Sequence, residues 1–479
     1  MLKKFLIALS LSNLCLYNII CILFYQRTFY VKNLPTAYSY LAFIFTELIL
    51  ASFFVLVWEA IKFINKSFLI KSAKAFLFIL VILLLNDASR DLEGINHDLI
   101  KYGLITIMLL LIIFRKTTKA TVLFLLISAP FTALIFVQST TGFFINWNKP
   151  KTKPIISLNH VDKSASRVLW LIFDEMDYRL PFIEKPNNVK LPAFESFQKQ
   201  ALNSENAYPP SDLTKTSIPS LIDGKLISAA GNDTNNLYIT YKDTGERVIW
   251  GSQPNVFSRA KSLGINTALF GEYLPYERLI GKDLSYCSWY SYYPEYTSSV
   301  DSFFANLYSQ LFYTFTGPNK TYFHRKKIYP SFLEEAKTIS CNSNYGLIMV
   351  HFPIPHHPFF YKTPWWKQNG EGYLNNLILA DYTLEQIRNS MMAQGLWDKT
   401  NIIISADHCY RKKKRFFGIE DNRVPFMIKM AGQKEAYTFL PKFNTVISQD
   451  LVLAILKKEV NTPKETIQWL NKHIDQNIH

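Results

Sequence analysis

The chain has 479 residues, of which 49% are hydrophobic and 15% aromatic, and its formal net charge is +15. This length excludes a single small domain and allows two or three domains, each with its own core. The positive charge alone would suit nucleic acid, but no motif of interleaved basic and aromatic residues accompanies it. We therefore expect no nucleic-acid partner, and a basic surface that meets anionic lipid headgroups or glycans instead.

Apolar residues concentrate in the first 140 positions. Five stretches there are candidate membrane spans, at 5–25, 38–61, 67–85, 98–114 and 119–138. The third and fourth are marginal because lysines lie in or beside them. One set of connections carries most of the basic residues, namely Lys3, Lys4, Lys62, Lys66, Lys71, Lys74, Arg115, Lys116 and Lys119. This bias predicts a cytoplasmic N-terminus and, after an odd number of spans, an exported remainder.

The predicted secondary structure changes after the last candidate span. We predict a transmembrane domain at 1–140, a polar linker at 141–166 and an exported domain at 167–479. In the exported part, apolar strands alternate with amphipathic helices, which favours an α/β fold with a central, mainly parallel sheet. The predicted strands are 168–173, 266–270, 345–352, 401–406 and 424–429, and the predicted helices are 191–202, 256–263, 374–394, 445–458 and 463–475.

Three of these strands are followed by side chains that bind metals. Asp174 comes directly after the first strand, and Asp407 and His408 follow the run of isoleucines at 402–404. The strand at 345–352 brings His351, with His356 and His357 shortly after it. Because parallel strands end at one edge of a sheet, these groups are expected to meet. Carboxylate oxygens with neutral imidazoles suit Zn²⁺ or Mn²⁺.

A loop rich in hydroxyl groups supplies a candidate nucleophile. It contains Thr214, Thr216 and Ser217 ahead of Pro219. A metal ion beside a threonine favours the alkoxide for attack on phosphorus or sulfur. A helix beginning near Pro219 would add free backbone N–H groups for the transferred anion. Glu175 is expected to face solvent or to cap a helix, and 411–415 is expected to form a solvated basic loop.

The order of these elements resembles the alkaline phosphatase and sulfatase superfamily. The five spans and exported domain resemble its membrane-anchored branch, the lipid A phosphoethanolamine transferases and the lipoteichoic acid synthases. The resemblance covers about 167–430, with the strongest motifs at 214–219 and 402–408. It implies a bacterial cytoplasmic membrane protein whose catalytic domain faces the periplasm or the extracellular side.

The resemblance also implies roles for particular residues. The transferases' Thr-x-x-Ser-x-Pro segment matches Thr214 to Pro219, and its first threonine is the nucleophile. The spacing in nucleotide pyrophosphatases nominates Ser217 instead, and Thr216 stays a third choice. The expected metal ligands are Asp174, Asp407 and His408. The family's His-x-x-x-x-His-x-Pro motif leaves His351, His356 and the adjacent His357 as substrate-binding residues.

Two departures from the family pattern bear on function. Cys409 stands where the family has a glycine, and 411–423 contains no histidine, so we expect one metal site and doubt a second. We expect a zinc- or manganese-dependent transferase that moves a phospholipid headgroup unit, similar to phosphoethanolamine, to an envelope lipid or glycan. A phosphate or sulfate ester hydrolase is the alternative with the same residues. A non-catalytic relative that binds lipid or signals is the alternative from another class.

Overall fold

The computed structural model describes residues 2–24, 29–64, 66–89, 97–113, 116–147, 158, 166–233, 235–292, 294, 296, 302–316, 319–418 and 420–474. The linker predicted at 141–166 lies mostly outside these residues. By its internal contacts the chain divides into two units. One, the membrane unit, comprises Met1–Thr152 and Pro294–Lys320, and the other, the sulfatase-like unit, comprises Lys153–Tyr293 and Thr321–His479.

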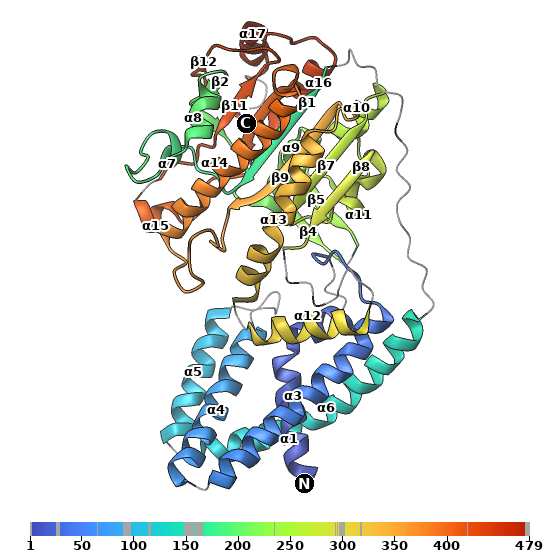
Figure 1. The fold of residues 1–479 in the computed structure, drawn as a ribbon, viewed down its shortest axis with the longest axis vertical. Helices are drawn as coiled ribbons and strands as arrows, with labels where there is room; N and C mark the ends of the chain where they lie inside the picture. The colour runs from blue at the N-terminus through green and yellow to red at the C-terminus, as the bar shows by residue number, and fades with distance from the viewer. Residues whose placement is uncertain are drawn as a thin grey trace. The chain divides into compact units, whose positions relative to one another are not determined.

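The membrane unit consists of apolar helices (Figure 1). They are α1 (Leu2–Cys15), α2 (Tyr17–Phe24), α3 (Ala37–Ile64), α4 (Ser67–Ser89), α5 (His97–Ile113), α6 (Thr117–Asn146) and α12 (Phe303–Phe315). Among the described residues, α3, α4 and α6 are long and apolar enough to cross a membrane, and α1 with α2, bent by 71°, forms a fourth span if counted as one. The apolar part of α5 is shorter. The structure thus supports three or four of the five predicted spans, and these helices indicate a membrane anchor.

Helix α12 joins the membrane unit although its sequence lies within the stretch predicted as one exported domain. Asn306 accepts a hydrogen bond from the Ser39 hydroxyl of α3 at 2.9 Å, and Gln310 donates to the Ser39 carbonyl at 2.9 Å. The Thr46 hydroxyl lies 3.1 Å from the Gln310 side-chain oxygen. Asn306 and Gln310 are fully buried. Because buried amides need partners, these bonds hold α12 against α3.

The sulfatase-like unit is built on an eight-stranded sheet with the order β12-β2-β11-β10-β1-β9-β7-β8. Strand β11 runs antiparallel to both of its neighbours, and the other pairs are parallel. The strands are β1 (Val168–Asp174), β2 (Leu202–Ser204), β7 (Thr267–Glu272), β8 (Tyr286–Tyr290), β9 (Leu347–Pro355), β10 (Asn401–Ala406), β11 (Phe426–Lys429) and β12 (Tyr437–Phe439). The predicted α/β class with a mainly parallel sheet is confirmed.

Two smaller sheets and the helices complete this unit. The small sheets comprise β3 (Ala207–Tyr208) with β13 (Phe443–Asn444), and β4 (Ile227–Asn232), β5 (Leu237–Tyr241) and β6 (Arg247–Ile249). The helices are α7 (Arg179–Phe182), α8 (Pro192–Gln198), α9 (Thr214–Asp223), α10 (Val256–Ser262), α11 (Tyr276–Ile280), α13 (Lys320–Ser340), α14 (Gly370–Ala393), α15 (Lys413–Phe417), α16 (Ser448–Leu456) and α17 (Pro463–His473). The helix expected near Pro219 begins five residues earlier, at Thr214.

The central strands are buried along their whole length. Every residue of β1, β9 and β10 is buried, which explains their continuous apolar sequences. Alternate residues of β1, including Leu169 and Leu171, join the core formed with α8, α13 and α14. The intervening residues point to the opposite face, where α16 contacts β1. Helices therefore cover both faces, and the carboxyl edge is where polar side chains emerge.

A buried ion pair fastens α13 to the end of β7. Arg325 donates through Nε and Nη2 to the two carboxylate oxygens of Glu272, at 3.0 and 2.7 Å. Both side chains are 1% exposed. Arg325 Nη1 also donates to the His357 carbonyl at 2.8 Å, so it holds the loop after β9 as well. Bidentate geometry and further acceptors offset the cost of desolvating two charges.

We predict that Arg325→Met destabilises the protein by about 3–5 kcal/mol, because Glu272 is left charged and buried without its partner. Thermal unfolding of the full chain in detergent is the measurement. Adding Glu272→Gln to Arg325→Met removes the orphaned charge, so the double variant should recover part of the lost melting temperature. A single variant that melts like the wild type would show that this pair does not organise the unit.

Candidate metal centre and nucleophile

Two buried carboxylates lie side by side at the carboxyl edge of the sheet. Asp174 is the last residue of β1, and Asp407 follows β10, whose Ala406 pairs with Phe173 of β1. Asp407 is fully buried, and Asp174 is 3% exposed. The Asp407 Oδ1 accepts hydrogen bonds from the backbone N–H groups of His408 at 2.8 Å and Glu175 at 3.1 Å. These bonds fix the direction of the carboxylate and leave Oδ2 facing the site.

His351 reaches the same place from within β9, where it pairs with Ile172 and Gly271. Its Nδ1 lies 3.2 Å from the Glu272 carbonyl and 2.8 Å from the Tyr276 hydroxyl. A proton on Nδ1 satisfies the carbonyl and leaves the lone pair on Nε2. A Cβ at Gly271 would lie 3.0 Å from the His351 Cβ, so the glycine makes room for the imidazole. Nε2 is buried and has no hydrogen-bond partner among the described residues.

His408 presents a second imidazole nitrogen to the two acids. Its Nδ1 lies 3.0 Å from the Cys409 carbonyl, which can only accept a hydrogen bond, so Nδ1 carries the proton. Its Nε2 is 3.6 Å from Asp174 Oδ1 and 3.5 Å from Asp407 Oδ2. Both imidazoles are thus oriented through Nδ1 by backbone carbonyls, a common outer-shell arrangement for metal-binding histidines.

Thr214 is the hydroxyl that faces this group. It is the first residue of α9, and its Oγ1 lies 3.4 Å from Asp174 Oδ1 and 3.2 Å from His408 Nε2. The Ser217 hydroxyl instead donates to the Asp407 backbone carbonyl. The Thr216 hydroxyl donates to the Leu213 carbonyl at 3.0 Å. Of the three candidate nucleophiles, Thr214 is the one whose hydroxyl contacts side chains of the site, those of Asp174 and His408.

The electrostatics of the group favour a cation. Burial raises the pKa of Asp174 well above its usual value, and the nearby Asp407 and Glu175 carboxylates raise it further. Burial lowers the pKa of His351 to about 4, so its imidazole is neutral at neutral pH and has a lone pair to share. Uncompensated anions are costly to bury, and a divalent cation between them would remove that cost.

The donor atoms also fit a metal ion geometrically. Asp174, His351 and Asp407 each offer one ligand atom, and these three atoms lie within 4.8 Å of one another. Asp407 Oδ2, like His351 Nε2, is buried without a hydrogen-bond partner in the described part of the chain. Oxygen and imidazole donors without sulfur suit Zn²⁺ and Mn²⁺. The sequence grouped His408 with the two acids, but the imidazole in this group of three is that of His351, which we expected to bind substrate; His408 Nε2 lies beside the group, 3.5 and 3.6 Å from the acids.

Further charged residues lie next to the candidate metal ligands. Glu175 is buried rather than solvent-facing, and its backbone has a φ of 65°. This left-handed conformation turns its side chain to Arg411, whose Nε donates to the carboxylate at 3.0 Å. Arg411 Nη2 lies 3.0 Å from His356 Nε2. Arg411 belongs to the run that we expected to form a solvated loop. Its sequence, a row of basic residues, carried no sign of this contact.

His356 and His357 lie in the loop after β9, and their positions differ. His356 is tied into the site by Arg411 and by its own N–H, which donates to the Asp174 carbonyl at 3.1 Å. The ring of His357 packs against Phe359, with centroids 5.3 Å apart. Burial lowers the pKa of His357 to about 4. The structure therefore brings His356 to the border of the group, while the contacts of the His357 ring lie elsewhere.

A parallel sheet that gathers buried acids, neutral imidazoles and one hydroxyl at its carboxyl edge is typical of metal-dependent enzymes that act on charged esters. The family model described as sulfatase matches residues 168–457. This chain therefore belongs to the sulfatase family, within the alkaline phosphatase and sulfatase superfamily, as predicted. Members of this superfamily use divalent metals, and the buried Asp-His-Asp group is the corresponding feature here.

Several solved structures are similar to this chain at low sequence identity. The PsFucS1 sulfatase from Pseudoalteromonas sp. is 11% identical, with a TM-score of 0.44 over 62% of this chain and 69% of that one. A phosphonate monoester hydrolase of Agrobacterium radiobacter is 13% identical, with a TM-score of 0.42 over 61% and 74%. An alkaline phosphatase superfamily protein from Vibrio parahaemolyticus is 12% identical, with a TM-score of 0.41 over 64% and 72%. No curated protein sequence matches the chain.

We predict that the purified full chain holds about one zinc or manganese ion per chain. Asp407→Asn should lower the metal content to below about a tenth of an ion per chain, because an amide cannot replace the charge of the carboxylate ligand. Elemental analysis after gel filtration is the measurement. Asp381→Asn is the matched control. Asp381 is also a buried acid, 5% exposed, but it accepts a hydrogen bond from the Phe194 N–H at 2.8 Å and lies outside the group. Equal metal loss in both variants would refute the assignment.

Proposed function

We propose that this protein is a membrane-anchored, metal-dependent phosphoryl-group transferase. It would move a phospholipid headgroup unit, of the phosphoethanolamine kind, to an envelope lipid or glycan through a covalent intermediate on Thr214. The observation that carries the proposal is the position of the Thr214 hydroxyl, 3.4 Å from Asp174 and 3.2 Å from His408 at the start of α9. A hydroxyl nucleophile beside metal ligands is an arrangement that suits such transfer.

The roles of the residues follow from these contacts. Asp174, Asp407 and His408, with His351, are the residues that would hold the metal, zinc first and manganese as the alternative. When bound, a divalent cation favours the alkoxide of a nearby hydroxyl and neutralises charge on the transferred group. His408 Nε2 lies 3.2 Å from the Thr214 oxygen, so as a ligand it would hold the cation next to that oxygen. Thr214 is the first residue of α9, and the positive end of the helix dipole favours an anion beside it.

The reaction would proceed in two displacements at phosphorus. The Thr214 oxygen loses its proton and forms a bond to the headgroup phosphorus while the bond from phosphorus to the diacylglycerol oxygen breaks, and the diacylglycerol oxygen takes up a proton. An acceptor hydroxyl then forms a bond to phosphorus while the bond from Thr214 to phosphorus breaks, and the proton that the acceptor loses is replaced on the Thr214 oxygen. His356 and Arg411 lie at the border of the site, where the acceptor would approach. His351 is so deeply enclosed that we now favour it as a ligand over an acceptor-binding residue.

The membrane helices support a lipid donor, because they would keep the enzyme where phospholipid headgroups are concentrated. The basic residues before 140 favour a cytoplasmic N-terminus and a sulfatase-like unit on the periplasmic or extracellular side, and the resemblance to membrane-anchored transferases implies the bacterial cytoplasmic membrane. Hydrolysis of a phosphate or sulfate ester would use the same residues with water as acceptor. The family description favours this second candidate. Cys409 in place of glycine motivates the non-catalytic alternative.

We predict that Thr214→Ala lowers turnover of a phospholipid donor by at least about 10³-fold, because the covalent intermediate loses its oxygen. Mass spectrometry of tryptic peptides after incubation with membrane phospholipids measures the intermediate directly. The wild type should carry a headgroup phosphoryl mass on the peptide that contains Thr214.

Thr216→Ala is the matched control, since it removes a neighbouring hydroxyl that bonds only within its own loop. It should keep both the adduct and most of the turnover. An adduct on Ser217 would move the nucleophile to that residue. Turnover that survives Thr214→Ala would rule out the proposed covalent route, and the absence of turnover and adduct in the wild type would favour the non-catalytic alternative.

A further inference from the structure

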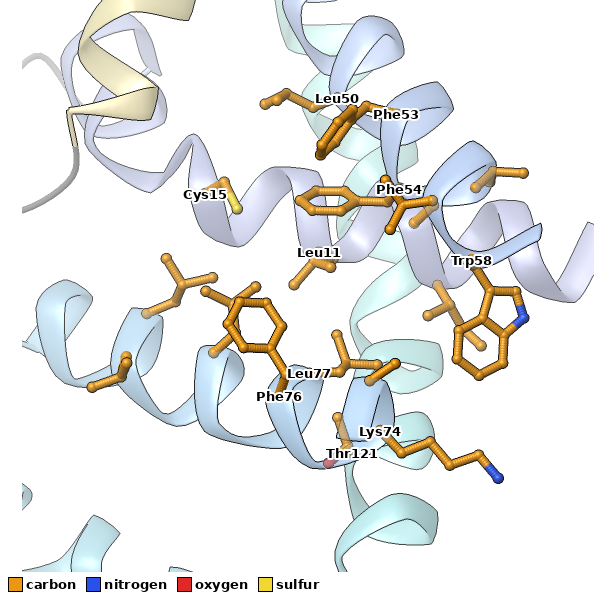
Figure 2. A pocket seen from close by; sticks show the side chains of 18 of the residues that line it. Leu11, Cys15, Leu50, Phe53, Phe54, Trp58, Lys74, Phe76, Leu77 and Thr121 are labelled. Carbon is orange, nitrogen blue, oxygen red and sulfur yellow. The ribbon is translucent and has the colours of Figure 1, made fainter. Parts of the chain in front are cut away.

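A large groove lies within the membrane unit, bounded by α1, α3, α4 and the start of α6. Figure 2 shows Leu11 of α1 and Leu77 of α4 directed into it from opposite sides, with Phe54 and Trp58 of α3 beside them. The cavity volume is about 1360 Å³. Pockets for small molecules rarely exceed about 1,000 Å³, so this space suits a larger, elongated ligand.

The lining of the groove changes along its length. Its middle is apolar, and one end lies near the beginning of α1 and carries Lys3, Lys4, Lys62 and Lys74. The opposite end carries, among the described residues, the polar side chains of Asn18, Tyr296, Tyr313, Thr314 and Lys320. On α3 the lining runs from Leu50 to Lys62, about 18 Å at 1.5 Å per residue. One leaflet of a bilayer provides about 15 Å of hydrocarbon, so the groove matches the length of an acyl chain.

Helix α12 indicates where the second end lies relative to a membrane. Its polar side is turned inward, with Asn306 and Gln310 buried against α3. Its outward side is aromatic, since Phe304, Tyr308 and Phe315 are 78%, 60% and 67% exposed. Aromatic side chains gather at the boundary between headgroups and hydrocarbon. Because Tyr313, Thr314 and Phe315 of α12 also line the groove, its second end lies at such a boundary.

We propose that this groove binds a phospholipid, with an acyl chain between α1, α3 and α4 and the phosphate at the end that carries Lys320. The Lys320 ammonium carries the positive charge that a phosphodiester needs, and the Asn18 amide adds hydrogen-bonding capacity. The charge bias of the loops places the Lys320 end in the outer leaflet.

We infer further that the bound lipid is the donor of the headgroup unit, and this step rests on the proposed function. The chain passes from the membrane unit into the sulfatase-like unit directly after Lys320. A lipid held at this end would present its phosphate on the side of the membrane to which the catalytic unit is exported. The groove would thus select a diacyl substrate over soluble phosphate esters.

Native mass spectrometry of the full chain, exchanged into detergent with dioleoyl phosphatidylethanolamine, tests the groove directly. Leu77→Trp should fill the space and lower retention of the lipid by about tenfold or more. Leu80→Trp, which lines the same groove, is the second variant in case the first fails to fold. Leu123→Trp is the matched control, because Leu123 is 59% exposed on α6 and does not line the groove. Equal retention in all of these proteins would overturn the proposal.

The position of the phosphate has its own test. Lys320→Gln should weaken retention of dioleoyl phosphatidylethanolamine but not of dioleoylglycerol, which lacks the phosphate, whereas Lys74→Gln should leave both unchanged. Loss of the phospholipid in Lys74→Gln alone would reverse the assigned direction and overturn this part of the proposal.

Activity measurements with two substrates distinguish a failure of this inference from a failure of the proposed function. Leu77→Trp should slow turnover of the phospholipid while leaving hydrolysis of a soluble nitrophenyl phosphodiester unchanged. A wild type that acts on neither substrate would contradict the proposed function, and lipid retention would still decide the groove. A Leu77→Trp variant that turns over the phospholipid at the normal rate would refute the groove as the donor site.

Discussion

The structure of the catalytic unit depends on placing two carboxylates, Asp174 and Asp407, side by side in an interior that excludes water. Two adjacent strands must end in register to bring them together, which the pairing of Phe173 with Ala406 achieves. Like charges in such a place repel each other and lose their hydration. A divalent cation between the two carboxylates would offset both costs, and the neutral imidazole of His351 is a further donor for it.

The acidic residues around this pair of aspartates form ion pairs with arginines. Glu175 follows Asp174 in a left-handed conformation that a non-glycine residue adopts only where other contacts stabilise it, and the Arg411 contact is one of these. Behind His351, Glu272 is paired with Arg325, which also holds the carbonyl of His357. Glu175 and Glu272 thus each have an arginine partner, whereas the ion-pair contacts of Asp174 and Asp407 within the described residues are with His408, and a divalent cation would fit between these two acids.

Much of the unit could be predicted from the sequence because its strands are buried on both faces and read as unbroken apolar runs. The acids at their ends, and the Thr-x-x-Ser-x-Pro segment at 214–219, followed from position and resemblance. His351 was harder to assign because β9 extends to Pro355, so the residue lies inside the strand and not at its end. Its role depends on register across β1 and β7, which no local pattern reveals. Arg411 and α12 were missed because their partners are distant in sequence.

X-ray absorption spectroscopy of the purified, metal-loaded full chain tests the central claim most directly, since it reports the ligand atoms of the metal. With zinc bound, the account predicts a first shell of oxygen and nitrogen at about 2.0–2.2 Å, with the outer scattering of imidazole and no sulfur. A sulfur neighbour at about 2.3 Å would place Cys409 on the metal and contradict the assignment. So would a shell without imidazole, because His351 and His408 would then have no part in the centre.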